Sequence, residues 1–189
     1  MDQFASQLIH GRTHISPKRL GDPGPSRTQV QSILNAAGAA PDHGRLLPWR
    51  FIEIQASSRE RLGEVFANCL IDRDSNATEE QIKEAKEKAG RGPLLLLAVA
   101  NYLDQEPIIR KEEKLISLGC AIQNILLSAH SFGFGSGLSS GKALQSERMK
   151  ELFSLKDHED PICFITIGTV LKKKPDRLRP SFDQYHQIF

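Results

Sequence analysis

The sequence has few cysteines, and their spacing indicates neither a disulfide framework nor a metal-binding thiol pair. The 189 residues include only Cys69, Cys120 and Cys163, and no two of them have C-x-x-C spacing. An odd number of cysteines cannot all be paired within one chain. Each of the three lies in an apolar stretch, which favours a small core residue over a redox or metal group.

Long uninterrupted apolar runs and a strong net charge are also absent. The stretch at 115–134 is interrupted by polar residues, and the N-terminal residues lack the apolar core of a signal peptide. We therefore expect a soluble, cytoplasmic protein without a membrane partner. A net charge of +2 is too small to indicate nucleic-acid binding. The basic run at 172–179 lacks interleaved aromatic residues and is typical of a solvated surface segment.

The sequence does contain alternating helical and strand-like patterns. Apolar spacing and capping residues, with capping-box spacing at Ser26 and Thr78, predict six helices. The first ends near residue 11, the second runs from 26 to about 40, and the third carries residues 62–70. The fourth is an exposed helix in a charged segment near 72–91, the fifth runs from 108 to 130, and the sixth begins at 146. Strands are predicted at 50–55, 93–102 and 161–169, and the continuous apolar run of the second is typical of a strand buried on both faces. Prolines and glycines disfavour regular structure at 11–25. This order predicts one α+β domain over residues 1–189, an α/β sandwich around a central sheet.

The helix expected at 108–130 has apolar residues around most of its circumference, so it must be covered on all sides. Small residues at 117, 119 and 121 permit close approach of a second copy. The C-terminal extension near 172–189 holds aromatic and aliphatic groups without a helical or strand period. We predict an obligate homodimer in which this extension reaches the partner subunit. The alternative is a tail that folds back on its own chain.

Three kinds of site find no support in the residue spacing. The glycines of GFGSG at 133–137 close a helix instead of opening one, which excludes a dinucleotide-binding loop. His10, His14, Asp42 and His43 lack the spacing of metal ligands on one helical face, so we expect no metal site. No G-x-S-x-G nucleophile elbow occurs in the sequence.

The segment that follows these glycines is a better candidate for ligand binding. Ser139, Ser140, Gly141 and Lys142 combine two hydroxyls, an unobstructed backbone and one cation. Such groups close together suit an anionic or polar ligand. Arg12, just after the first predicted helix, is a weaker candidate for an anion contact, because its position alone favours an exposed, solvated arginine.

Several motifs together resemble the nitroreductase family, and most strongly its short, YdjA-like branch. They are a first helix that ends in Arg12-Thr13, an APDH helix exit at 40–43 that leads to PWRF at 48–51, a long apolar helix that ends in GFG, and a following Ser-Gly loop. The resemblance covers residues 8–189. It implies a central mixed sheet flanked by helices and an intertwined homodimer with two FMN molecules bound across its interface.

The same resemblance assigns the cofactor contacts to individual positions. Contacts with FMN are expected from Gly11, Arg12, Thr13, Ala39, His43, Leu138, Ser139, Ser140 and Gly141. Of these, Ala39 and His43 are expected to reach the flavin bound mainly to the other subunit. Asp42 is interpreted as a turn or capping residue.

The chain departs from the family pattern at three of these positions. Gly11, Ala39 and Ser139 are neutral where the family has arginine. Lys142 and Lys18 are the candidates to supply the missing charge.

The function implied is an FMN-dependent oxidoreductase that takes a hydride from NADH or NADPH in a ping-pong cycle. The acceptor would be a nitroaromatic, a quinone or a related small molecule. No catalytic side chain is expected, because the cofactor carries the redox chemistry. Two alternatives remain: a flavin- or ligand-binding protein without turnover, and an atypical family reaction such as reductive dehalogenation or flavin cleavage.

Overall fold

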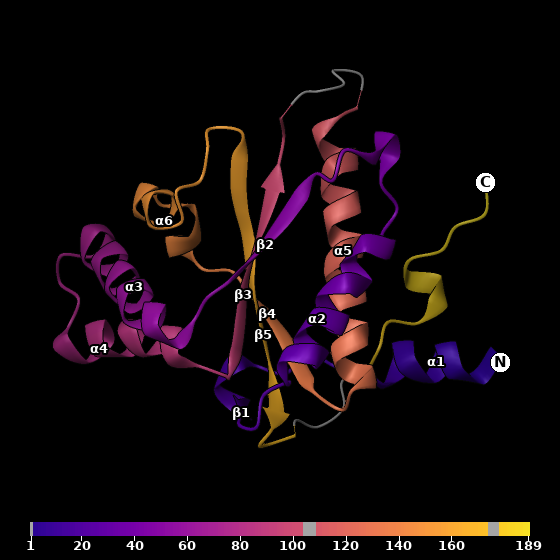
Figure 1. Ribbon diagram of the computed structural model, residues 1–189, viewed down its shortest axis with the longest axis horizontal. Coiled ribbons are helices and arrows are strands. Elements are labelled where there is room, and N and C mark those ends of the chain that lie inside the picture. The colour runs from indigo at the N-terminus through magenta and orange to yellow at the C-terminus, as the bar shows by residue number, and fades with distance from the viewer. Residues whose placement is uncertain (1, 104–108, 174–177) are drawn as a thin grey trace.

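The computed structural model describes residues 2–103, 109–173 and 178–189, which form three layers (Figure 1). The α-helices in these residues are α1 (Asp2–Gly11), α2 (Arg27–Asn35), α3 (Arg59–Arg73), α4 (Glu79–Glu87), α5 (Lys111–Ser131) and α6 (Glu147–Leu152). The strands are β1 (Leu20–Gly21), β2 (Trp49–Glu53), β3 (Leu94–Asn101), β4 (Gly135–Ser139) and β5 (Glu159–Val170). The α+β class, with helices that flank a central sheet, is confirmed.

The sheet is built around β5, the longest strand. Its order is β1-β5-β3-β2, and β4 also pairs with β5, next to β1. All four strand pairs among the described residues are antiparallel. The expectation of a mixed sheet, which the family resemblance implied, was therefore wrong. In the part of the chain that the structure describes, one parallel pairing occurs, an isolated bridge between His14 and Ser136 of β4.

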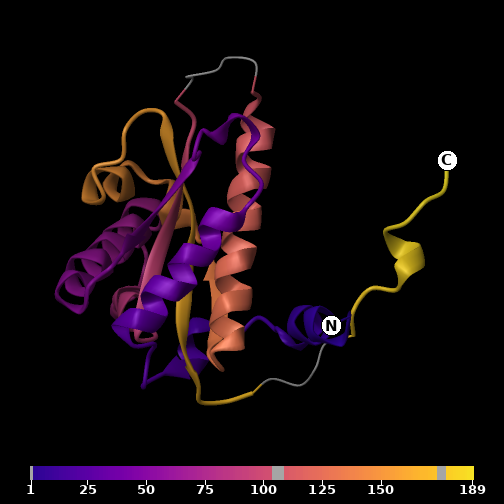
Figure 2. The ribbon, with the colours of Figure 1, turned by 45° about the vertical axis from the view of Figure 1, so that its right-hand side comes forward.

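The sheet separates two apolar cores, because β3 is buried on both faces. Alternate residues from Leu94 to Ala100 join a cluster with α2 and α5. The residues between them, Leu95, Leu97 and Val99, join a second cluster with α3 and α6. Figures 1 and 2 show these two groups of helices on opposite faces of the sheet, with α4 beside α3. This two-sided burial explains why the apolar run of this strand, noted in the sequence, is continuous.

The segment 11–25 is more regular than its prolines and glycines suggested. Leu20 and Gly21 form β1 by pairing with Val170 and Thr169 of β5, and a 3₁₀ turn, η1 (Pro17–Arg19), precedes them. The prediction of irregular structure was therefore wrong for these residues. The partner strand lies about 150 residues away in the sequence, so local composition alone did not reveal it.

Helix α5 is not covered all round within one chain. Its start, expected at 108, is observed at Lys111, and residues 104–108 lie outside the described part of the chain. Ile116 is 66% exposed, and Gly119 on the same face is exposed as well. Among the described residues, no helix is long and apolar enough to cross a membrane.

The three cysteines are free thiols. Cys69 and Cys163 are buried, which confirms them as small core residues, whereas Cys120 is half-buried on α5. Burial raises the pKa of the Cys163 thiol to about 11, so this group stays protonated at neutral pH.

Both ends of the chain extend away from the three layers on the same side, as Figure 2 shows for α1 and residues 178–189. The aromatic side chains of Phe4, Phe182 and Tyr185 are exposed there. A contact joins the two ends, because the Arg179 guanidinium donates hydrogen bonds to the carbonyl oxygens of His10 (2.7 Å) and Arg12 (3.2 Å).

Candidate functional site

The loop after α1 is attached to β4, which brings two sequence-predicted segments together. The Ile15 amide donates a hydrogen bond to the Ser136 carbonyl (2.9 Å), and His14 bridges to Ser136. Gly137 permits this approach, because a Cβ there would collide with the carbonyl oxygen of Ile15. The glycines of GFGSG therefore serve close packing and strand entry, and Gly133, at φ +83°, ends α5.

A cavity of about 480 Å³ opens where β4 ends. Of the sequence-predicted residues, Leu138, Ser139, Ser140 and Gly141 line it, and so do His14 and Ser16 from the attached loop. Its apolar wall includes Phe66 of α3 and Phe164 of β5, whose rings meet edge to face with centroids 5.7 Å apart. The cavity thus combines an apolar, aromatic wall with hydroxyls and an exposed backbone, a lining that suits a ligand with an apolar body and polar groups.

The same cavity is strongly basic. Arg73 at the end of α3, Lys88 in the 3₁₀ turn η5 (Lys88–Gly90), Arg91 and Lys142 all line it. None of the described lining residues is an aspartate or a glutamate, and none of the four cations has an ion pair among the described residues.

Arg59 holds the backbone on which two of these cations lie. Its guanidinium donates to the carbonyl oxygens of Ala89 (2.9 Å), Gly92 (3.2 Å) and Pro93 (3.2 Å), and more weakly to that of Arg91 (3.4 Å). Burial lowers the pKa of Arg59, and these carbonyls compensate its charge in place of a carboxylate. The segment 88–93 is therefore fixed against the start of α3.

Arg12 lies at a second basic point, where the two ends of the chain meet. Its Nε is fully enclosed and has no hydrogen-bond partner among the described residues. Burial, together with the nearby Arg179 charge, lowers the pKa of Arg12. Two guanidinium groups close to each other favour an anion between them. Gly11 precedes Arg12 against His130 of α5, and Thr13 is exposed.

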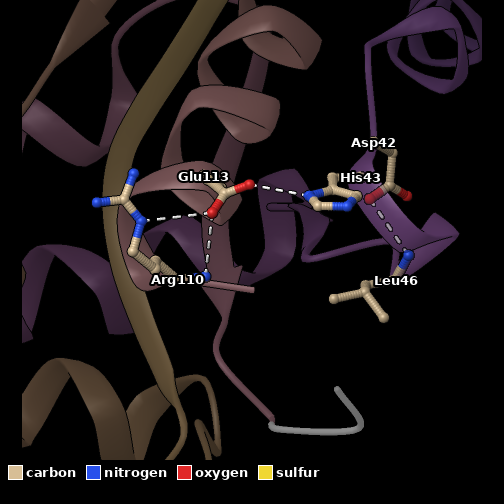
Figure 3. A network of polar contacts seen from close by, with 5 residues as sticks. All are labelled: Asp42, His43, Leu46, Arg110 and Glu113. Atoms are coloured by element: carbon tan, nitrogen blue, oxygen red, sulfur yellow. Dashed lines mark hydrogen bonds and ion pairs between the residues drawn. The ribbon is translucent and has the colours of Figure 1, made fainter. Parts of the chain in front are cut away.

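Ala39 and His43 lie away from the cavity, and neither lines it. Both are exposed, in the 3₁₀ turns η2 (Ala36–Ala39) and η3 (His43–Arg45). Figure 3 shows the His43 ring directed at Glu113 near the start of α5, with Nδ1 at 2.9 Å from Oε2. This hydrogen bond is the main cause that lowers the pKa of Glu113.

Asp42, next to His43, is a turn residue, as expected. Its carboxylate accepts hydrogen bonds from the backbone amides of Leu46 (3.2 Å) and Leu47 (2.8 Å). The side chain thereby satisfies two donors of the loop that leads into β2.

The sequence of this chain matches a known family. The family model described as "Nitroreductase family" matches residues 13–169. The chain belongs to the nitroreductase family. The protein YdjA of Escherichia coli K12, which is named as an NAD(P)H nitroreductase, is 32% identical over 165 residues, or 87% of each chain. A relative from Haemophilus influenzae Rd with a similar name is 32% identical over 164 residues, which cover 85% of this chain and 86% of the relative.

A solved nitroreductase-like protein from Bacillus cereus has the same fold. It superposes with a TM-score of 0.81 and 20% sequence identity, over 97% of this chain and 95% of that one. Prediction of the family and of the fold from the sequence is thereby confirmed.

Sequence reasoning missed several residues of the candidate site. Arg73, Lys88 and Arg91 belong to a charged segment that local composition marked as an exposed helix, and Arg179 belongs to a run interpreted as solvated. The unbalanced positive charge of 172–179 was the available signal for Arg179. Of the two lysines proposed to replace lost arginines, Lys142 lines the cavity, whereas Lys18 in η1 does not.

Proposed function

We propose that this nitroreductase is an FMN-dependent enzyme that oxidises NADH or NADPH and reduces a nitroaromatic, a quinone or a related acceptor. Family membership and the names of the relatives at 32% identity support the reaction class. When bound, FMN would take a hydride from the reduced nicotinamide and pass two electrons to the acceptor in a ping-pong cycle.

The observation that carries the cofactor assignment is the pairing of Arg12 with Arg179. An enclosed guanidinium nitrogen without a partner, beside a second guanidinium, fits a terminal phosphate that would accept hydrogen bonds from both. Thr13 adds a hydroxyl at the same loop. The loop is joined to β4, so a phosphate held there would lie on the segment that leads to the cavity, whose apolar wall and hydroxyls suit the ring system of the cofactor. Because no pyrophosphate-binding glycine loop precedes a helix, these residues fit FMN better than FAD.

The proposed enzyme is a homodimer in which each site takes residues from both subunits. Ala39 and His43 are exposed and do not line the cavity of their own chain, so a second copy would be needed to bring them to a flavin. The uncovered face of α5 at Ile116 and Gly119 offers an apolar surface for that copy. The extension near 172–189 would then reach the partner and bury its exposed aromatic groups.

An absorption spectrum of the purified full-length protein tests the cofactor assignment. Flavin bands are expected, and the flavin released by heating should elute as FMN in chromatography. A colourless protein that takes up no added FMN would refute the assignment. Oxidation of NADH and NADPH with and without a nitroaromatic acceptor then separates an enzyme from a binding protein without turnover, and product analysis separates nitro or quinone reduction from dehalogenation or flavin cleavage.

A further inference from the structure

We propose that the cavity selects electron acceptors that carry an anionic group, such as a carboxylate on a flat aromatic ring, over neutral acceptors of the same shape. This inference rests on the proposed function and adds a substrate class to it. The observation behind it is the charge of the cavity wall, which the family assignment does not explain.

Four cations from separate elements converge on this one cavity. Arg73 comes from the end of α3, Lys88 from η5, Arg91 from the segment before β3, and Lys142 from the 3₁₀ turn η6 (Lys142–Gln145). Some exposed cations elsewhere in the described residues are balanced by carboxylates: Lys86 pairs with Glu64, and Arg148 pairs with Asp72. The described cavity wall holds no carboxylate. Among the described residues, no carboxylate on the wall therefore balances these four cations.

The cofactor accounts for only part of this charge. The isoalloxazine ring is neutral when oxidised and carries at most one negative charge when reduced, and the phosphate is assigned to Arg12 and Arg179, which do not line the cavity. A surplus of positive charge remains beside the aromatic wall of Phe66 and Phe164. A ligand that places a ring on that wall and a carboxylate near the cations would use both features.

The cations on the segment 88–93 are held in place before any ligand binds. Arg59 fixes the carbonyl oxygens of Ala89, Gly92 and Pro93, so Lys88 and Arg91 extend from an anchored backbone. A preorganised charge costs less ordering on binding, which favours discrimination between charged and neutral ligands.

The test compares 4-nitrobenzoate with 4-nitrobenzamide, which have the same ring and nitro group but differ by one charge at pH 7. We expect the FMN-loaded protein to favour the benzoate by about tenfold or more in kcat/KM with NADH, because one or two charge contacts at a partly solvated site give that ratio. The ratio should fall as salt is raised from about 0.01 M to 1 M, where the screening length shortens to about 3 Å. In the double variant Arg73→Gln/Arg91→Gln, which keeps Lys88 and Lys142, the ratio should fall toward one, whereas in the control Lys83→Gln, on the exposed part of α4, it should stay at the wild-type value.

A binding measurement separates failure of this inference from failure of the proposed function. Calorimetric titration of the oxidised protein with each compound gives the benzoate-to-benzamide affinity ratio without turnover. A ratio near one in the wild type, or a ratio that the double variant leaves unchanged, overturns the inference even if both compounds are reduced. Preferential benzoate binding without reduction would instead refute the enzymatic function, whereas the inference that the cavity selects anions would stand.

Two further readouts assign the cations to other ligands and would also overturn the inference. In the first, the double variant alters KM for NADPH relative to NADH while the acceptor ratio stays constant, which assigns the charge to the donor's phosphate. In the second, the double variant loses FMN, measured as flavin absorbance per subunit, while the acceptor ratio of the retained holoenzyme is unchanged. Circular dichroism of both variants establishes that they are folded.

Discussion

Replacement of Arg12 by methionine should change flavin affinity and apoprotein stability in opposite directions. The substitution keeps an unbranched side chain but removes the guanidinium whose enclosed Nε has no partner among the described residues. If Arg12 holds the FMN phosphate, its loss removes a charge-assisted hydrogen bond of about 1.5–3 kcal/mol, which raises the Kd for FMN roughly 10- to 150-fold.

The stability of the apoprotein should not fall in the same variant. An unsatisfied buried polar group costs about 1–3 kcal/mol, and the Arg12 charge also lies near Arg179. Removing both penalties should leave the free energy of unfolding unchanged or raise it by up to about 3 kcal/mol. Fluorescence titration with FMN measures the affinity, and urea unfolding of the apoprotein followed by circular dichroism measures the stability.

Arg61→Met is the matched control, because Arg61 is exposed, lies outside the cavity and makes no hydrogen bond among the described residues. It should change neither quantity by more than about 0.5 kcal/mol. An Arg12→Met protein that binds FMN as the wild type does, but unfolds at lower urea, would refute the reasoning and make Arg12 a structural residue.

Three other perturbations test the fold and the shared site. Arg50→Met should lower the free energy of unfolding at pH 7 by about 1.5–3 kcal/mol, because buried Glu159 loses guanidinium hydrogen bonds of 2.7 and 2.9 Å. Since the Arg50 hydrogen bond lowers the pKa of Glu159, this stabilisation is complete above the unfolded-state pKa of about 4.5 and is lost as pH falls through the folded-state pKa; equal urea midpoints at pH 7 would contradict it. His43→Ala should weaken FMN binding and slow turnover, and unchanged values of both would remove His43 from the site. Deletion of residues 180–189 should lower dimer stability and flavin content in sedimentation velocity; a truncated dimer with full FMN would refute the role of the extension, and a flavin-loaded monomer of the full chain would refute the shared site.

Features that depend on neighbouring residues were accessible from the sequence. The capping boxes at Ser26 and Thr78 form as their spacing predicted, and each places a helix start correctly. The run from Leu94 to Ala100 is buried on both faces of the sheet, as its unbroken apolar character indicated. Such signals are local, because a cap bonds three residues along and burial of a strand is recorded in its own residues. The family motifs are of the same kind, since each is a short contiguous pattern.

Which basic residues come together was decided by the tertiary structure alone. Arg12 and Arg179 are 167 residues apart, and the loop of Arg12 reaches β4 through backbone hydrogen bonding at Ser136 that depends on the bare backbone of Gly137. Likewise, Arg73 and Lys88 belong to a charged stretch whose local pattern is the same whether its side chains face water or line a cavity. Charge composition records how polar a segment is, but not which other segments it faces. That second property arises only when long-range strand pairing and helix packing bring the segments together. The sequence therefore determined the main helices, the long strands and the family, whereas the folded chain determined β1 and where positive charge collects.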